Sequence, residues 1–210
     1  MTVIHNKPDA PFAGNWMTRW RKVARRIRVP LGFAAAAVFL WRLYATAPHP
    51  LAIALSLALV APGLWLRGYA AGYVKKNQEL TQTGPYAYTR NPLYLGSMLI
   101  AAGFAVALSD LLFLAILIVG FLAIYIPVIV SEEAFLRSTF VDYAAYCNRV
   151  PRLLPRLRRA HVRSAISSPS EGRFSLELYR KHREYRSLIG VGFLYAGLVA
   201  SCFAHLYWPR

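Results

Sequence analysis

Residues 84–96 read GPYAYTRNPLYLG and lead directly into a long apolar segment. The stretch places tyrosines, an arginine and an Asn-Pro step at the point where polar sequence gives way to apolar sequence. A second polar feature, the adjacent pair Glu132 and Glu133, stands at the end of the next apolar segment. Ionisable groups at the ends of membrane spans are functional candidates by default. The two features together predict a polar site at one membrane face.

The apolar segments around these features are about long enough to cross a bilayer. The chain has 210 residues, of which 57% are hydrophobic, and four runs approach the roughly 20 residues that a span needs. A fifth run is slightly shorter and is joined to the next by the turn Ser109-Asp110. Because a membrane span must satisfy its own backbone hydrogen bonds, we expect helices. The prediction is an all-α polytopic membrane protein with about five transmembrane helices and cytosolic interfacial helices. The five spans are residues 30–47, 51–73, 92–108, 111–130 and 188–207.

The basic residues lie almost entirely on one side of these predicted spans. Of 25 Lys and Arg, seven precede the first span, four lie at or after the end of the second, and twelve lie between the fourth and fifth, so 23 share one side. The positive-inside rule then predicts a protein of the inner membrane, with a cytosolic N-terminus and the C-terminus outside. The net charge of +16 suits anionic membrane lipids as partners. Nucleic acid is not an expected partner, because no recognised binding module accompanies the charge.

The polar and apolar segments divide the chain into four parts. Phe135, Leu136, Phe140, Tyr143 and Tyr146 recur at helical spacing and predict one amphipathic helix that covers the site from the cytosol. Cys147 and Cys202 fall on opposite sides of the predicted bilayer, so no disulfide is expected between them. The four parts of the chain are a basic cytosolic arm (1–29), a four-span core (30–130), a cytosolic segment that completes the site (131–187), and the fifth span with an outer C-terminus (188–210).

The order of these motifs resembles the isoprenylcysteine carboxyl methyltransferase family and its phospholipid methyltransferase relatives. The resemblance covers roughly residues 67–155, less than half of the chain. It implies an integral membrane methyltransferase that holds S-adenosylmethionine at the cytosolic face and takes a lipophilic acceptor from the bilayer. The matching residues are Gly84-Pro85-Tyr86, Arg90-Asn91-Pro92-Leu93-Tyr94, Glu132-Glu133, and Tyr143-Ala144-Ala145-Tyr146 leading to Val150-Pro151.

The resemblance also implies which residues bind the cofactor. Their chemistry suits the donor, because the Glu132 carboxylate can accept hydrogen bonds from an ammonium group and tyrosine rings can face a sulfonium cation. A helix that starts at Asn91 offers free backbone N–H groups to a carboxylate. No catalytic residue is assigned. The implied cofactor-binding residues are Gln78, Glu79, Leu80, Thr81, Tyr86, Asn91, Pro92, Leu93, Tyr94 and Glu132.

The chain departs from the family pattern at Asn91, at Val128, and after Phe140, where the family's usual glycine is missing. Asn91 stands where the family has a histidine, and its side chain is also suited to capping the following helix. Val128, four residues before Glu132, stands where the prenylcysteine enzymes have an arginine that is associated with the acceptor. Val128 therefore predicts an acceptor that needs no cationic clamp. Glu133 is either a base for an amine acceptor or the partner of Arg137 at the i, i+4 spacing.

Several interpretations stay open from the sequence. An NADPH-dependent membrane reductase of the sterol-reductase type is an alternative enzyme, and a non-enzymatic lipid-binding membrane protein is a third possibility. None of the five histidines clusters with Cys or carboxylates at metal-ligand spacing, so no metal site is predicted. Arg42 is expected to reach the outer interface, whereas Arg67 either reaches the inner interface or faces the site. Gly63, Gly68 and Gly72 are expected to allow close helix packing. The oligomeric state and the identity of the acceptor cannot be predicted.

Overall fold

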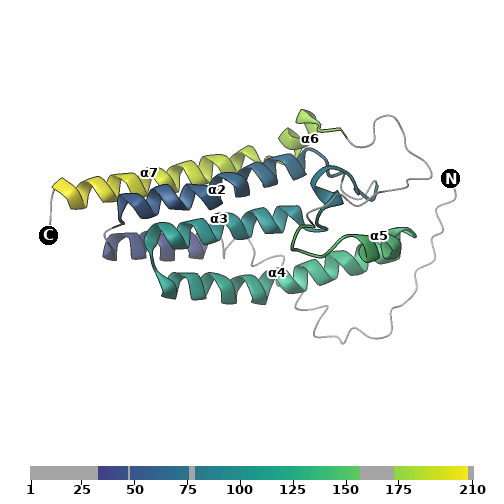
Figure 1. Cartoon of the computed structure of the whole chain (residues 1–210), viewed down its shortest axis with the longest axis horizontal. Helices are drawn as coiled ribbons and strands as arrows, with labels where there is room; N and C mark the ends of the chain where they lie inside the picture. The colour runs from purple at the N-terminus through teal and green to yellow at the C-terminus, as the bar shows by residue number, and fades with distance from the viewer. Residues whose placement is uncertain (1–32, 47, 76–78, 157–172, 208–210) are drawn as a thin grey trace.

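The computed structural model describes residues 33–46, 48–75, 79–156 and 173–207, and every regular element within these ranges is helical. The prediction of an all-α protein is therefore confirmed for this part of the chain. The long helices run side by side, with η1 and α5 at one end (Figure 1). We call this the motif end, and we call the opposite end, at the turn 109–110, the far end. The elements are the helix Phe33–Ala45, α2 (Pro50–Ala71), the 3-10 helix η1 (Gly84–Ala87), α3 (Pro92–Leu108), α4 (Leu111–Thr139), α5 (Tyr143–Arg149), α6 (Leu176–Lys181) and α7 (Tyr185–Tyr207).

Three of these helices, α2, α4 and α7, are long and apolar enough to cross a membrane. The helix Phe33–Ala45 and α3 are apolar but shorter, so three of the five predicted spans have full length and the prediction of five spans is not confirmed. The sequence also placed the end of the fourth span at residue 130, whereas α4 continues to Thr139. Glu, Ala, Leu and Arg in residues 131–139 all favour helix, so the apolar segment ends there but the helix does not. Glu132 and Glu133 consequently lie within the helix.

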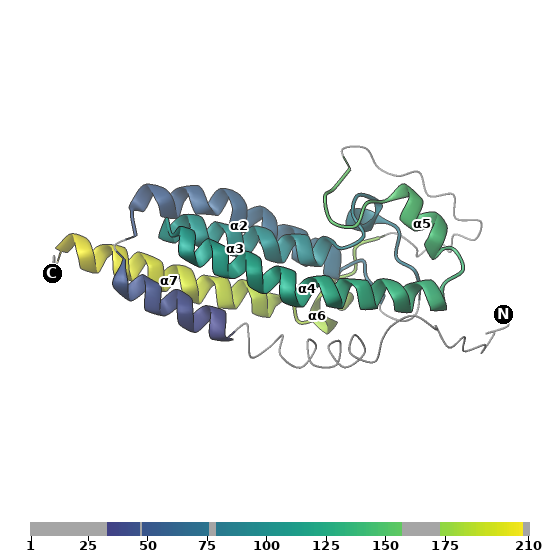
Figure 2. The same ribbon diagram turned by 90° about the horizontal axis from the view of Figure 1, so that it is seen from below.

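The closest helix packing joins α2 to α3. A Cβ atom at Gly63 would lie 2.8 Å from the carbonyl oxygen of Gly96, and one at Gly96 would lie 2.7 Å from the carbonyl oxygen of Gly63. Such small residues let two helix backbones approach directly, and Figure 2 shows the two helices side by side. The packing prediction is confirmed for Gly63. Gly68 and Gly72 instead face side chains of a later segment, Tyr179 and Phe174.

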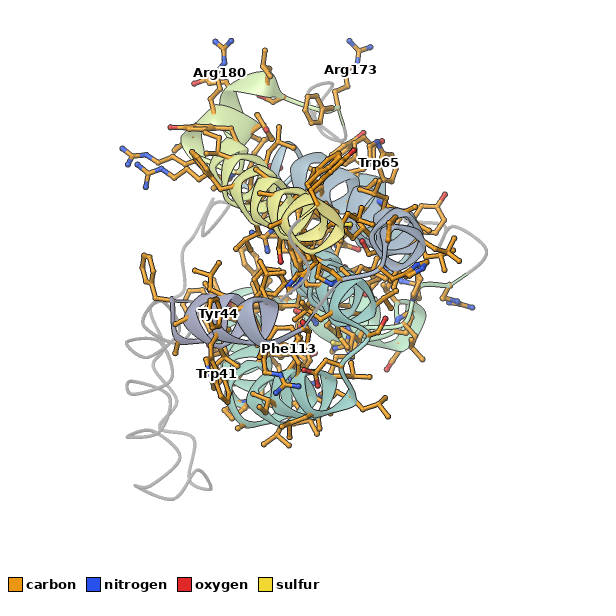
Figure 3. All side chains as sticks on the ribbon, turned by 90° about the vertical axis from the view of Figure 1, so that its left-hand side faces the viewer. Trp41, Tyr44, Trp65, Phe113, Arg173 and Arg180 are labelled. Carbon is orange, nitrogen blue, oxygen red and sulfur yellow. The ribbon has the colours of Figure 1, made fainter. Side chains whose placement is uncertain are left out.

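The apolar core lies toward the far end, where the helix Phe33–Ala45 packs on α3, α4 and α7. Its buried residues include Phe39, Leu43, Phe104, Phe113 and Leu198, and Phe113 is visible between the first helix and α4 in Figure 3. Arg42 forms an ion pair with Asp110, a partner that the sequence did not identify. Asp110 also caps α4, and the backbone N–H of Phe113 and the Arg42 guanidinium lower the pKa of its carboxyl group.

The predicted amphipathic helix over residues 135–146 is interrupted. Phe140 has an extended backbone (φ −120°, ψ 118°) and ends α4, and α5 begins only at Tyr143. Tyr143 and Tyr146 are buried, but Phe135 is 48% exposed. Helical spacing was right for α5 and wrong across the break, because spacing alone does not show where a chain turns. The predicted basic arm at residues 1–29 lies outside the described residues.

Candidate functional site

The motif in residues 84–96 is held in place by a non-helical segment that follows α5, residues 150–156. The backbone N–H of Arg90 donates to the carbonyl of Pro151 at 2.9 Å, and the N–H of Arg156 donates to the carbonyl of Tyr88 at 3.0 Å. Between them, the Thr89 hydroxyl donates to the carbonyl of Leu153 at 2.9 Å. Thr89 is 1% exposed, so its buried hydroxyl needs this partner. The two parts of the family signature are therefore in direct contact.

The Asn91 side chain takes part in this contact and does not cap α3. Its side-chain amide donates to the carbonyl of Arg152 at 2.8 Å, and it makes no capping bond to α3. The expectation of an Asn91 side-chain cap is therefore wrong: a cap would need Oδ1 as an acceptor, and the bond that the structure shows is instead the one that Nδ2 donates to Arg152. Pro92 occupies the first turn as predicted. The N-terminus of α3 receives no side-chain capping bond from Asn91.

Glu133 is at the centre of a charged cluster next to this contact. Its carboxylate pairs with Arg90 at 3.1 Å and accepts bonds from two nitrogens of Arg152, Nε at 3.0 Å and Nη2 at 2.8 Å. The predicted partner Arg137 is not the one that the structure shows, because Glu133 faces inward on α4 while Arg137 is exposed. The side chains of Glu133 and Arg90 are only 10% and 12% exposed. Two guanidinium groups around one carboxylate leave a net charge of +1.

Glu132, one residue earlier, has a different environment. It is exposed, and its Oε1 accepts a hydrogen bond of 3.0 Å from the hydroxyl of Tyr94 on α3. The Tyr94 ring is buried against Val128 and Ile129 and meets the ring of Tyr125 edge-on, with centroids 5.3 Å apart. The buried ring fixes the hydroxyl, and the hydroxyl in turn orients an accessible carboxylate. Two of the predicted cofactor-binding residues are thus brought into direct contact across α3 and α4.

Three buried tyrosines, Tyr86, Tyr143 and Tyr146, contact one another close to this pair. The Tyr146 hydroxyl donates to the carbonyl of Tyr86 at 2.7 Å, and Tyr143 lies beside Tyr146. Burial raises the pKa of Tyr86 above its usual range, and Tyr146 and Glu132 raise it further. Burial likewise raises the pKa of Tyr143 and Tyr146. Since the Tyr86 side chain is 8% exposed, it contributes more as packing than as an open ring face.

Of the predicted stretch 78–81, residues 79–81 are described, and one of them, Leu80, lies beside these tyrosines. Gln78 is outside the described residues. Leu80 packs on the cluster of Tyr143 and Tyr146, whereas Glu79 pairs with Lys75 at 3.0 Å. The hydroxyl of Thr81 accepts a bond from the backbone N–H of Lys75 at 3.4 Å. Within this stretch, Leu80 is the residue that the structure ties to the tyrosine cluster.

An apolar cleft of about 480 Å³ lies between α3 and α4 and reaches this site. Ala102, Phe121 and Ile126 are among its apolar lining residues, and Arg152 and Leu153 line it as well. Ile129 belongs both to the cleft lining and to the packing around Tyr94. The cleft therefore connects the apolar sides of two helices with the polar motif. Within the described part of the chain, no group of three or more His, Cys, Asp or Glu residues is arranged to hold a metal ion.

Comparison with known proteins gives this arrangement a family. A family model described as phospholipid methyltransferase matches residues 51–142, which include α3, α4 and all of α2 except its first residue. The chain is 34% identical over 148 residues to the cobalt-zinc-cadmium resistance protein CzcN of Cupriavidus metallidurans, covering 68% of this chain and 67% of that protein. It is 35% identical over 94 residues to the nickel-cobalt-cadmium resistance protein NccN of Alcaligenes xylosoxydans xylosoxydans, covering 45% of this chain and 43% of that protein. No solved structure matches. The chain belongs to the phospholipid methyltransferase family.

The family assignment confirms the resemblance that the motifs indicated, and it favours a methyltransferase over a reductase. The sequence did not identify Arg90 and Arg152 as partners of Glu133. Arg152 lies beyond the matched residues 51–142. The sequence did contain a feature that could have identified Arg152 as a site residue, because Arg152 directly follows the Val150-Pro151 step at the end of the signature.

Proposed function

We propose that this protein is an integral membrane methyltransferase that uses S-adenosylmethionine and methylates a lipophilic acceptor entering from the bilayer. Membership of the phospholipid methyltransferase family supports the reaction class. Three helices with the length and composition of membrane spans support the location. The contact between Tyr94 and Glu132 carries the assignment of the donor site, because it joins two motif residues from different helices in an accessible pair.

The residues of this pair fit the donor chemically. Glu132 is exposed, and the Tyr94 hydroxyl contacts its Oε1, so Oε2 can accept a hydrogen bond from an ammonium group. The start of α3 carries no side-chain cap, so its first-turn N–H groups can bind a carboxylate. When bound, S-adenosylmethionine supplies an electrophilic methyl group on a sulfonium. The protein then has to bind and orient both reactants.

The cleft between α3 and α4 is the proposed entry for the acceptor. Its lining is almost entirely apolar, which suits a hydrocarbon chain, and it reaches Arg152 and Ile129 next to the motif residues. Methyl transfer is an in-line displacement, so holding the two reactants in line can account for much of the rate. Val128 is 3% exposed and packs beneath Tyr94, so this position of α4 supplies an apolar side chain and no cation. Its apolar character supports an acceptor whose reacting group needs no cationic clamp at that position.

Calorimetry with S-adenosylhomocysteine and with NADPH tests this assignment. Wild type should bind S-adenosylhomocysteine, and Glu132→Gln should weaken binding by roughly 1.5–3 kcal/mol, the range for a hydrogen bond to a charged group. Tyr94→Phe, which keeps the ring and removes the hydroxyl, should also weaken it. Glu177→Gln is the matched control, since Glu177 is exposed on α6. Binding of NADPH without S-adenosylhomocysteine would favour the reductase alternative.

We further propose that this activity contributes to metal resistance. The support is the naming of two relatives as resistance proteins for cobalt, cadmium, zinc or nickel. Growth of a deletion strain on cobalt, zinc and cadmium salts, complemented with wild type or Glu132→Gln, tests the proposal. Equal rescue by the wild-type and Glu132→Gln genes would show that resistance does not depend on the donor site, and would contradict this proposal.

A further inference from the structure

A second groove lies on another part of the molecule, between α2 and the segment that contains α6 and the start of α7. Its volume is about 480 Å³, which is within the range of about 300–1,000 Å³ for small-molecule sites. The walls are mainly apolar and aromatic. They include Leu64, Trp65, Gly68, Phe174, Tyr179 and Leu188. Trp65 and Tyr69 stack with centroids 5.0 Å apart, and Tyr69 also stacks on Phe174 at 6.1 Å. We call this the aromatic groove.

The charged residues that line the aromatic groove neutralise each other. Arg67 Nη2 lies 2.8 Å from Glu184 Oε2, and Arg67 Nε lies 3.2 Å from the same oxygen. The two side chains are 16% and 13% exposed. The Ser187 hydroxyl donates to Glu184 at 3.3 Å, and Arg67 also contacts the first turn of α3 through the Leu93 carbonyl. Because these polar groups are satisfied, the groove suits an apolar occupant.

The segment that forms one wall of the groove also carries a strongly basic surface. This surface consists of five exposed residues, none of which forms an ion pair with another described residue: Arg173, Arg180, Lys181, Arg183 and Arg186. Glu177 is the exposed acidic residue described in the same segment, so the surface keeps a large positive excess. Figure 3 shows Arg173 and Arg180 pointing away from the helices, on the side of the molecule where Trp65 lies. The cations and the groove are thus adjacent.

We propose that this surface and groove bind an anionic phospholipid, with its phosphate on the basic surface and one acyl chain in the aromatic groove. An apolar groove beside exposed cations is complementary to such an amphiphile in both polarity and charge. Tryptophan and tyrosine side chains are typical of the level where lipid headgroups meet hydrocarbon. The proposed site is distinct from the Tyr94–Glu132 pair and from the α3–α4 cleft, and it goes beyond the proposed methyltransferase activity.

Trp65 provides a direct readout, because brominated acyl chains quench tryptophan fluorescence on contact. The full-length protein is reconstituted in phosphatidylcholine bilayers that contain a minor share of brominated phosphatidylglycerol or brominated phosphatidylcholine. Subtracting the signal of Trp65→Phe isolates Trp65 from the other tryptophans. We expect phosphatidylglycerol to quench Trp65 at a concentration at least about fivefold lower than phosphatidylcholine, since each well-placed cation attracts an anionic lipid.

Two variants and one control define the outcome. Replacing Arg180, Lys181, Arg183 and Arg186 together by Gln should abolish the preference, whereas Arg137→Gln, an exposed cation on α4, should keep it. Gly68→Leu should reduce quenching by both lipids, because even a Cβ atom added there would lie 3.4 Å from the Tyr179 ring, and the rest of the leucine side chain would take up space in the groove. Equal quenching by the two lipids in wild type, or a preference that survives the fourfold replacement, would overturn the proposal. Quenching that disappears as protein density rises would assign the groove to a second copy of the chain and would also overturn it.

Discussion

Replacing each of two adjacent glutamates separates the structural part of the site from its binding part. Glu133 accepts charge-assisted bonds from Arg90 and Arg152, and Glu133→Gln keeps the shape but removes the charge. Arg152 is 54% exposed and can turn toward water, whereas Arg90 is 12% exposed and cannot. The loss is therefore about that of one hydrogen bond to a charged group, roughly 2 kcal/mol. For a chain of this size, that lowers the melting temperature by about 4–8 °C.

Glu132→Gln is the matched control for this effect. Glu132 is exposed, and a glutamine oxygen can still accept the bond from Tyr94, so its melting temperature should fall by less than about 2 °C. Thermal unfolding of the purified protein in one detergent, followed by intrinsic fluorescence, measures both variants. Equal melting temperatures for wild type and Glu133→Gln would refute the reasoning, as would a larger loss in Glu132→Gln.

Three further predictions concern topology, pH and the acceptor. The 23-to-2 division of basic residues predicts that a reporter after Arg210 is extracytoplasmic and one near Ser168 is cytoplasmic; cytoplasmic signals from both would contradict five spans. Because burial raises the pKa of Tyr86 and Tyr146, their contribution to stability is complete below about pH 10 and is lost as the pH rises further, by about 1.4 kcal/mol per pH unit for each tyrosine. Chemical unfolding between pH 9 and 11.5 checks this slope, which should decrease when either tyrosine is replaced by Phe. The apolar side chain at Val128, which is buried and supplies no cation, predicts little methylation of a farnesylcysteine carboxylate, and efficient turnover of a farnesylcysteine analogue would disprove that prediction.

The sequence predicted the helices better than it predicted their side-chain partners. Apolar runs and the turn at Ser109-Asp110 placed α2, α3 and most of α4 within a few residues, because length and polarity are local properties. The same reasoning ended the fourth helix too early, since residues 131–139 change in polarity but keep their helix propensity. Long-range pairs could not be inferred in this way. Arg67 and Glu184 are 117 residues apart, and either could have been exposed.

For the site as well, the motifs identified candidate residues but did not show their burial or their contacts. The signature made both Tyr94 and Glu132 candidates for one site, and the fold brings them to 3.0 Å. It could not show that Glu133 is buried while Glu132 is exposed, because adjacent helical residues point in directions about 100° apart and only packing decides which one faces inward. Nor could it show that Asn91 bonds to the chain at Arg152 instead of capping α3, since both uses of an amide fit the same sequence.

Transfer of a labelled methyl group tests the central claim most directly. The protein is reconstituted with lipids extracted from the membranes of its natural host and is given S-adenosylmethionine with a tritiated methyl group. Wild type should move label into the organic phase. Glu132→Gln and Ala102→Trp, which fills the α3–α4 cleft, should each lower the rate by about tenfold or more, because misplacing either reactant is costly. Ala58→Trp, on an exposed face of α2, should act as wild type. No transfer by wild type, or an unchanged rate in Glu132→Gln and Ala102→Trp, would contradict the account.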